Sequence, residues 1–105
     1  MYKIAVIGGP DSVVGFRALG LDTFAVTEPQ EARHTLRELA KITDDPYVII
    51  YLEETLAQSM LDEVRKYNEL PSPAVILIPG RDGPIGIGQN ALQQAVEKAV
   101  GTNIL

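Results

Sequence analysis

The sequence predicts an α/β fold with βαβ architecture, in which a single four-stranded parallel sheet carries helices on both faces. Short apolar runs that fit strands alternate four times with longer amphipathic runs that fit helices, which favours parallel strands joined by crossovers. The strand-like runs are also nearly continuous in apolar residues, as in strands that are buried on both faces. We expect one domain over residues 1–105, with residues 101–105 as a flexible C-terminal tail.

The N-terminal part of the chain fits a strand, a helix and a second strand. Residues 4–7 are apolar and stop at a Gly-Gly-Pro turn, so we expect the first strand there. Asp11 or Ser12 is the expected N-cap of a helix that ends at Gly20. The apolar side of that helix is expected to consist of Val13, Val14, Phe16 and Leu19. Residues 23–26 fit a second, shorter strand.

The next segment fits a helix and the most strongly β-prone strand of the chain. Thr27 is the expected N-cap, Pro29 lies in the first turn, and Gln30 completes a capping pattern. The helix is expected to end near Lys41, before an Asp-Asp-Pro break. Residues 47–51 are rich in β-branched and aromatic side chains, which favours the third strand.

The C-terminal part fits two short helical pieces, a strand and a final helix. We expect Glu53 and Glu54 to open a helical turn, with Ser59 as the cap of a second helical piece. That second piece carries Asp62 and Arg65 at a spacing that suits an ion pair. Residues 74–78 fit the fourth strand, and a Gly- and Pro-rich loop then leads to a helix that ends near residue 100.

Composition excludes several classes of function. The chain has a net charge of −5 and a pI near 4.7, which disfavours binding to the phosphate backbone of nucleic acids. It has no cysteine, so disulfides and thiolate metal sites are excluded. Its apolar runs are much shorter than the roughly 20 residues that span a bilayer, and no signal-peptide pattern precedes the first strand. We therefore expect a cytoplasmic protein, without membrane insertion, that starts at its native first residue.

Receiver-like and Rossmann-like domains share this architecture and place ligands beyond the carboxyl ends of their strands. The Gly8-Gly9 turn, however, fits neither nucleotide-binding glycine spacing, and no lysine lies near it. The acidic pair, aspartate and lysine of receiver chemistry are missing from the predicted strand ends. Glu53 and Glu54 are interpreted as first-turn acids that favour the positive end of a helix dipole.

No other catalytic or metal-binding pattern is present in the sequence. His34 is the only histidine, and an imidazole without a histidine or cysteine partner is a poor metal site, so we expect it to be solvated. No serine is placed with histidine and an acid in a pattern that suggests nucleophilic catalysis. The sequence therefore predicts no catalytic residue, no cofactor and no bound metal.

The segment after the fourth strand is the least ordinary part of the chain. Ile85 and Ile87 are apolar residues in a loop of glycines and prolines. They either tuck under the loop and anchor the last helix, or they are presented to a partner. The last helix carries an apolar stripe rich in small residues, and the chain ends in Ile104 and Leu105. An apolar tip at a terminus indicates a partner surface.

Five segments, in order along the whole chain, together resemble the F subunit of the V/A-type ATP synthases. They are YKIAVIG at 2–8, DSVVGFRALG at 11–20, PAVILIP at 73–79, GIG at 86–88, and VEKAVG at 96–101 with NIL at 103–105. The Gly-Gly-Pro after the first strand departs from the Gly-Asp-x that is more usual in that family.

The resemblance implies a non-catalytic rotor component of the central stalk in a proton- or sodium-translocating complex. It implies binding to the coiled-coil D subunit, contact with the hexamer of A and B subunits, and a part in coupling rotation to ATP synthesis or hydrolysis. It places the protein on the cytoplasmic face of the membrane, and we expect a monomer when the chain is isolated. The last helix is the implied contact with the D subunit.

From the apolar stripe and tip we expect the partner surface to include six residues. They are Ile85, Ile87, Leu92, Val96, Ile104 and Leu105. The alternative is a degenerate receiver-like module that binds a small anion at the Gly8-Gly9 turn or at the loop from Gly80 to Gly88.

Overall fold

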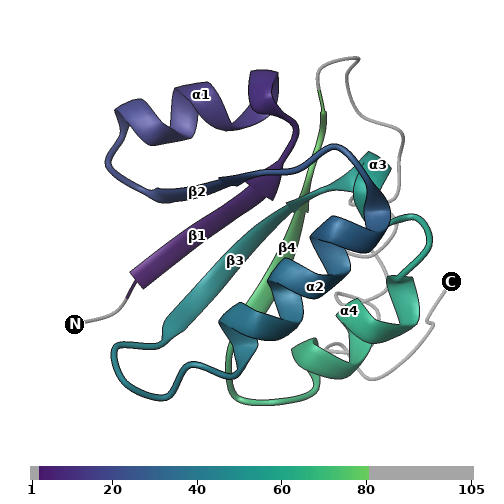
Figure 1. Ribbon diagram of the computed structural model, residues 1–105. Coiled ribbons are helices and arrows are strands. Elements are labelled where there is room, and N and C mark those ends of the chain that lie inside the picture. The colour runs from purple at the N-terminus through teal and green to yellow at the C-terminus, as the bar shows by residue number, and fades with distance from the viewer. Residues whose placement is uncertain (1–2, 81–105) are drawn as a thin grey trace, which may run out of the picture.

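The computed structural model describes residues 3–80, in which strands and helices alternate as predicted (Figure 1). In chain order the elements are β1 (Lys3–Gly8), α1 (Pro10–Ala18), β2 (Asp22–Ala25), α2 (Pro29–Ala40), β3 (Tyr47–Glu53), α3 (Glu54–Ala57), α4 (Leu61–Asn68) and β4 (Ala74–Ile78). The final predicted helix lies outside the described residues.

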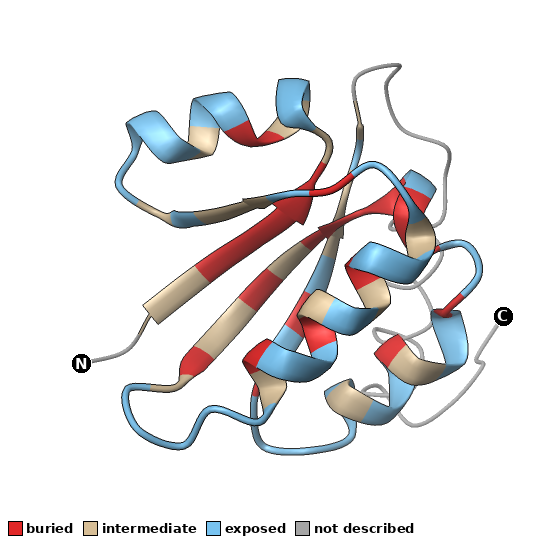
Figure 2. Ribbon diagram, viewed as in Figure 1, coloured by how far each residue is buried: buried red, intermediate tan, exposed pale blue. Residues whose placement is uncertain are grey.

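The four strands form one parallel sheet in the order β2-β1-β3-β4, which confirms the predicted fold class. The apolar runs of the central strands β1 and β3 include fully buried residues, whereas the equally apolar β4 lies at an edge of the described sheet. Strand β1 is buried on both faces, because it has a neighbour on either side and helices above and below (Figure 2). In β3, the residues that face the α1 side, Ile49 and Tyr51, are half-buried.

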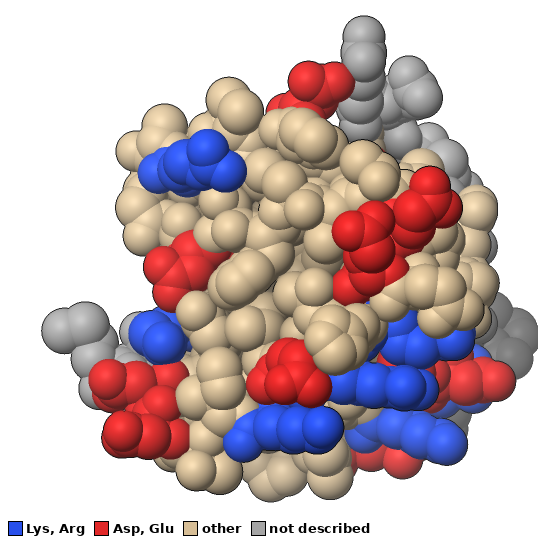
Figure 3. All heavy atoms as spheres, viewed as in Figure 1, with Lys and Arg blue, Asp and Glu red and all other residues tan. Residues whose placement is uncertain are grey.

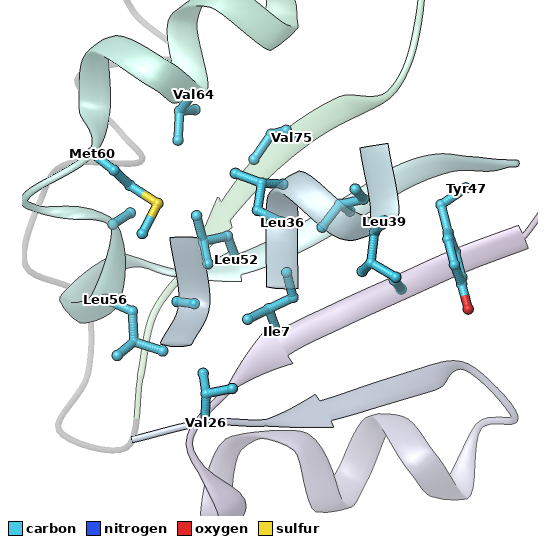
Figure 4. Close-up of a cluster of buried hydrophobic side chains, with 14 residues drawn as sticks. Ile7, Val26, Leu36, Leu39, Tyr47, Leu52, Leu56, Met60, Val64 and Val75 are labelled. Carbon is cyan, nitrogen blue, oxygen red and sulfur yellow. The ribbon is translucent and has the colours of Figure 1, made fainter. Parts of the chain in front are cut away.

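The two faces of the sheet meet different helices. On one face, α2, α3 and α4 cover a core in which Ile7, Leu36 and Leu52 pack together (Figure 4). Val6 and Tyr51 alternate with these strand residues and therefore point to the opposite face. There α1 covers the sheet, with the Phe16 ring stacked on Tyr51 at a centroid distance of 6.1 Å.

The starts of α1 and α2 differ from the predicted caps. Both helices begin with a proline, Pro10 in α1 and Pro29 in α2, and neither has a side-chain cap hydrogen bond. The prediction of Asp11 or Ser12 as a cap is wrong, and so is that of Thr27, whose hydroxyl donates to the Glu31 carboxylate instead. Proline fixes φ near the helical value and needs no N–H partner, so it takes the first helical position itself.

The predicted cap of α4 is also wrong. Met60, which is buried, is the N-cap residue, and Ser59 lies one position before it. The backbone carbonyl of Ser59 accepts a hydrogen bond from Arg33 Nη2 at 2.9 Å, which ties the turn to α2. The predicted ion pair on α4 is confirmed, since Arg65 Nη1 lies 3.3 Å from Asp62 Oδ1.

Helix α1 buries less of its apolar surface than the sequence predicts. Val13 is buried and Phe16 is half-buried, but Val14 and Leu19 are 63% and 75% exposed. The helix covers only the β1–β2 half of its face of the sheet, so its outer side remains in contact with solvent (Figure 2).

Gly15 lies in the middle of α1 and offers a test of local helix stability. A Cβ added at this position would have no heavy atom within 4 Å. Because glycine in a helix interior costs about 0.5–1 kcal/mol relative to alanine, we expect Gly15→Ala to raise the free energy of unfolding by that amount. Urea denaturation of both proteins measures it, and an unchanged or lower midpoint would contradict the packing of α1.

Tyr47 connects β3 to β2 across the strand between them. Its hydroxyl donates a 2.6 Å hydrogen bond to Asp22 Oδ2, and Lys3 Nζ lies 4.4 Å from its ring centroid. The register between β1 and β3 shifts between Lys3 and Ile4, so Tyr47 joins the core cluster although strict alternation would place it on the other face. Burial, and then the hydrogen bond and charge of Asp22, raise the pKa of Tyr47 to about 12.

Asn68, the last residue of α4, is bound to strand β4. Its side-chain amide donates to the Val75 carbonyl at 3.0 Å and accepts from the Val75 N–H at 2.7 Å. Both backbone groups of Val75 are thereby satisfied by one side chain.

Candidate functional site at the carboxyl edge of the sheet

The carboxyl ends of three strands converge on Glu53. Strand β1 ends at Gly8, β3 ends at Glu53, and Gly80 follows β4 by two residues. In parallel α/β proteins this edge of the sheet is where ligands usually bind, so it is the first place to look for chemistry.

The Glu53 carboxylate is buried and hydrogen-bonded at both oxygens. The residue is 8% exposed. Oε2 accepts the Gly9 N–H at 2.6 Å, and Oε1 accepts the Thr55 hydroxyl at 3.1 Å. Gly9 is the N-cap residue of α1, and its own carbonyl accepts the N–H groups of Ser12 and Val13. Glu53 therefore holds the start of α1 against the end of β3.

Two glycines leave room for this carboxylate. A Cβ on Gly8 would lie 2.9 Å from Glu53 Oε2, and a Cβ on Gly80 would overlap Oε1 and crowd the carboxylate carbon. At such distances the carboxylate would have to shift, and its two hydrogen bonds oppose that shift, so close packing favours glycine at both positions. Sequence analysis assigned these glycines to turns and did not detect that they enclose a side chain.

The interpretation of Glu53 as a first-turn helix acid is wrong. Glu53 is the last residue of β3, whereas Glu54 does lie in the first turn of α3 and is only 3% exposed. Sequence analysis missed Glu53 because its partner lies 44 residues earlier in the chain. The available signal was its position at a strand end beside a glycine turn, which becomes meaningful only when β1 and β3 are known to be neighbours.

This arrangement does not suit a small anion at the Gly8-Gly9 turn. The Gly9 N–H, which would be a donor to such an anion, already donates to Glu53. A second buried acid, Glu54, follows directly, and negative charge at these two residues repels an anion. The second anion site considered from the sequence was the loop from Gly80 to Gly88. Only Gly80 of this loop is described, and it too lies against the Glu53 carboxylate.

The six residues predicted to bind a partner lie outside the described residues, so that prediction stays untested. They are Ile85, Ile87, Leu92, Val96, Ile104 and Leu105. The chain leads into this segment from Gly80, beside Glu53.

His34 is exposed on α2, as predicted.

Within residues 3–80 the structure contains no group of three or more His, Cys, Asp and Glu side chains that could hold a metal ion. In the same residues, no helix is long and apolar enough to cross a membrane.

Comparison with known proteins assigns the chain to a family. Residues 4–96 match the model of the ATP synthase (F/14-kDa) subunit family. The F subunit of the V-type ATP synthase of Fusobacterium nucleatum is 45% identical over 105 residues, which cover 100% of this chain and 97% of the relative. The corresponding V-type protein of Clostridium perfringens is 44% identical, with 100% and 98% covered. The F subunit of the A-type ATP synthase of Methanococcus maripaludis is 30% identical, with 97% and 98% covered. The similarity thus extends over essentially the full length of V-type and A-type relatives, and the chain belongs to the F subunits of the V/A-type ATP synthases.

Proposed function

We propose that this chain is a non-catalytic rotor component in the central stalk of a V/A-type ATP synthase, where it binds the coiled-coil D subunit. The observation that carries the proposal is the 45% identity to a V-type F subunit over the whole chain. The complex as a whole moves protons or sodium ions and makes or hydrolyses ATP. In this proposal the chain lies on the cytoplasmic face of the membrane and helps to couple rotation to that chemistry.

The geometry of the carboxyl edge supports a structural role for this part of the molecule. Glu53 lies where parallel α/β proteins often place reacting groups. Its carboxylate, however, accepts hydrogen bonds from the Gly9 N–H and the Thr55 hydroxyl, and glycines pack around it. A side chain held in this way ties the Gly8-Gly9 turn at the start of α1 to the end of β3. The segment after Gly80 carries the six residues that we propose as the D-binding surface.

Co-expression with the cognate D subunit, followed by size-exclusion chromatography with mass determination, tests the proposal. We expect a one-to-one complex, and a monomer of 11.4 kDa when the chain is alone. Elution of the two proteins apart at low salt would contradict it. Contact of this chain with the A and B subunits is a further part of the proposal, and cross-linking in the assembled complex would test it.

Variants in the last segment separate binding from folding. Deletion of residues 101–105 is expected to leave the circular dichroism spectrum unchanged and to weaken binding to the D subunit. Leu92→Asp and Val96→Asp are expected to weaken binding in the same way. If either substitution instead unfolds the isolated chain, that residue belongs to the core, and the proposed surface is reduced to the loop and the tail.

A further inference from the structure

The described helices α2 and α4 border a groove of about 440 Å³ that is lined by three basic and two acidic side chains. The residues lining it include Arg33, Arg37, Gln58, Ser59, Glu63 and Lys66. Basic side chains gather over this region of the surface, at the lower right of Figure 3. This local charge is opposite in sign to the net charge of −5 on the chain.

Two arginines in the groove share a single carboxylate. Arg37 donates from Nε and Nη2 to Glu63 Oε1, at 3.0 and 2.7 Å. Arg33 Nε lies 3.7 Å from Glu63 Oε2, which is beyond hydrogen-bond distance, and both of these buried atoms lack a hydrogen-bond partner. One carboxylate thus faces two guanidinium charges, and most N–H donors of the two groups are not used within the described residues.

The remaining charges do not restore the balance. Asp62 also lines the groove, but its side chain is 88% exposed and pairs with Arg65 at 3.3 Å. Lys66 is exposed and has no ion pair with any residue between 3 and 80. The five charged side chains that line the groove therefore leave about one positive charge in excess, and Lys66 is the cation among them without an ion pair in the described residues.

We propose that the α2–α4 groove is a docking site for an acidic segment of another protein of the complex, one of whose carboxylates pairs with Lys66. Charge complementarity supports this occupant, because a carboxylate can pair with Lys66 without displacing an existing ion pair of the described residues, and such pairing orients the incoming segment. Because the Glu63 carboxylate already lines the groove, singly charged carboxylates spaced along a chain fit better than a multiply charged phosphate. Leu61, which also lines the groove and is 36% exposed, provides apolar contact for the alkyl part of such side chains. This surface is separate from the proposed D-binding segment and does not depend on it.

A zero-length carbodiimide, which joins a lysine amine to a carboxylate in direct contact, tests the proposal in the purified, assembled complex. We expect a peptide that links Lys66 to an Asp or Glu of another chain. Lys66→Arg is the matched control: it keeps the charge and is expected to assemble normally, and this cross-link should disappear. If Lys66 forms only links within its own chain, or none, the proposal is overturned.

Charge reversal provides an independent measurement. Lys66→Glu is expected to weaken association of the chain with the rest of the complex by roughly tenfold at low salt. Arg17→Glu is the control, since it makes the same change in net charge on α1, where Arg17 bonds to the Thr23 hydroxyl. Equal weakening by both variants would indicate a general charge effect and overturn the proposal. Titration with inorganic phosphate is a further test. Saturable binding of phosphate to the isolated chain, with shifts in the amide resonances of Gln58 and Ser59, would also overturn the proposal, because the groove would then be an ion site.

Discussion

Replacing Glu53 by alanine is expected to lower the free energy of unfolding by about 2 kcal/mol. The carboxylate makes a 2.6 Å hydrogen bond to the Gly9 N–H, and a hydrogen bond to a charged group contributes more than one between neutral groups. Without the carboxylate, that N–H at the start of α1 loses its partner. Urea denaturation followed by circular dichroism measures the change, and a loss below about 0.5 kcal/mol would show that the bond contributes little.

The glycines around Glu53 provide a control for this result. Gly80→Ala alone is expected to destabilise the fold by about 1–3 kcal/mol, because its Cβ would overlap the carboxylate. In the Glu53→Ala protein, Gly80→Ala should cost much less, because the overlapping atoms are gone. A double-mutant cycle reports this coupling directly. Additive effects of the two substitutions would mean that the carboxylate moves aside and that the close packing is not enforced.

Raising the pH from 10 to 12 is expected to remove about 2 kcal/mol of stability through Tyr47 alone. A tyrosine in an unfolded chain has a pKa near 10, whereas burial and Asp22 raise the pKa of Tyr47 to about 12 in the fold. Between these values the unfolded chain releases the phenolic proton and the folded chain retains it. The contribution is therefore fully present below pH 10 and is lost as the pH rises through 12.

Tyr47→Phe isolates this contribution from the other groups that titrate at high pH. The variant lacks the hydroxyl that donates to Asp22, so we expect it to be less stable than the natural protein at pH 9. The difference between the two proteins should shrink as the pH rises, because only the natural protein loses the Tyr47 contribution. Denaturation curves at several pH values provide the comparison. A difference that stays constant from pH 9 to 12 would contradict the raised pKa.

The strands were the most predictable part of the fold. Residues 74–78 form β4 with the predicted bounds, and the central strands β1 and β3 contain the predicted runs. The run in β1 is apolar because neighbours on both sides and both faces exclude water, and β4 is equally apolar although it lies at an edge of the described sheet. Strand β2 is displaced by one residue, and its sequence is only partly apolar because it lies at the edge of the sheet.

The helix caps and the buried acid were not predictable in the same way. The caps of α1 and α2 depend on whether a polar residue or the proline takes the first position, and the sequence offers both. The sequence predicts an exposed acid at Glu53, because it shows only the neighbours of this residue along the chain. Its burial follows from the pairing of β1 with β3, which brings the Gly9 N–H to it. A carboxylate is tolerated there because that donor stabilises its charge.

The hydrogen bonds between Asn68 and Val75 have a consequence for how separate copies of the chain behave at high concentration. Strand β4 is an edge of the described sheet, and its AVILI sequence combines strong β propensity with no charge, which is typical of aggregation-prone segments. Asn68 occupies both backbone groups of Val75, so an incoming strand would first have to break two hydrogen bonds. The side chain thus acts as a local barrier to edge-to-edge association before the chain has joined its complex.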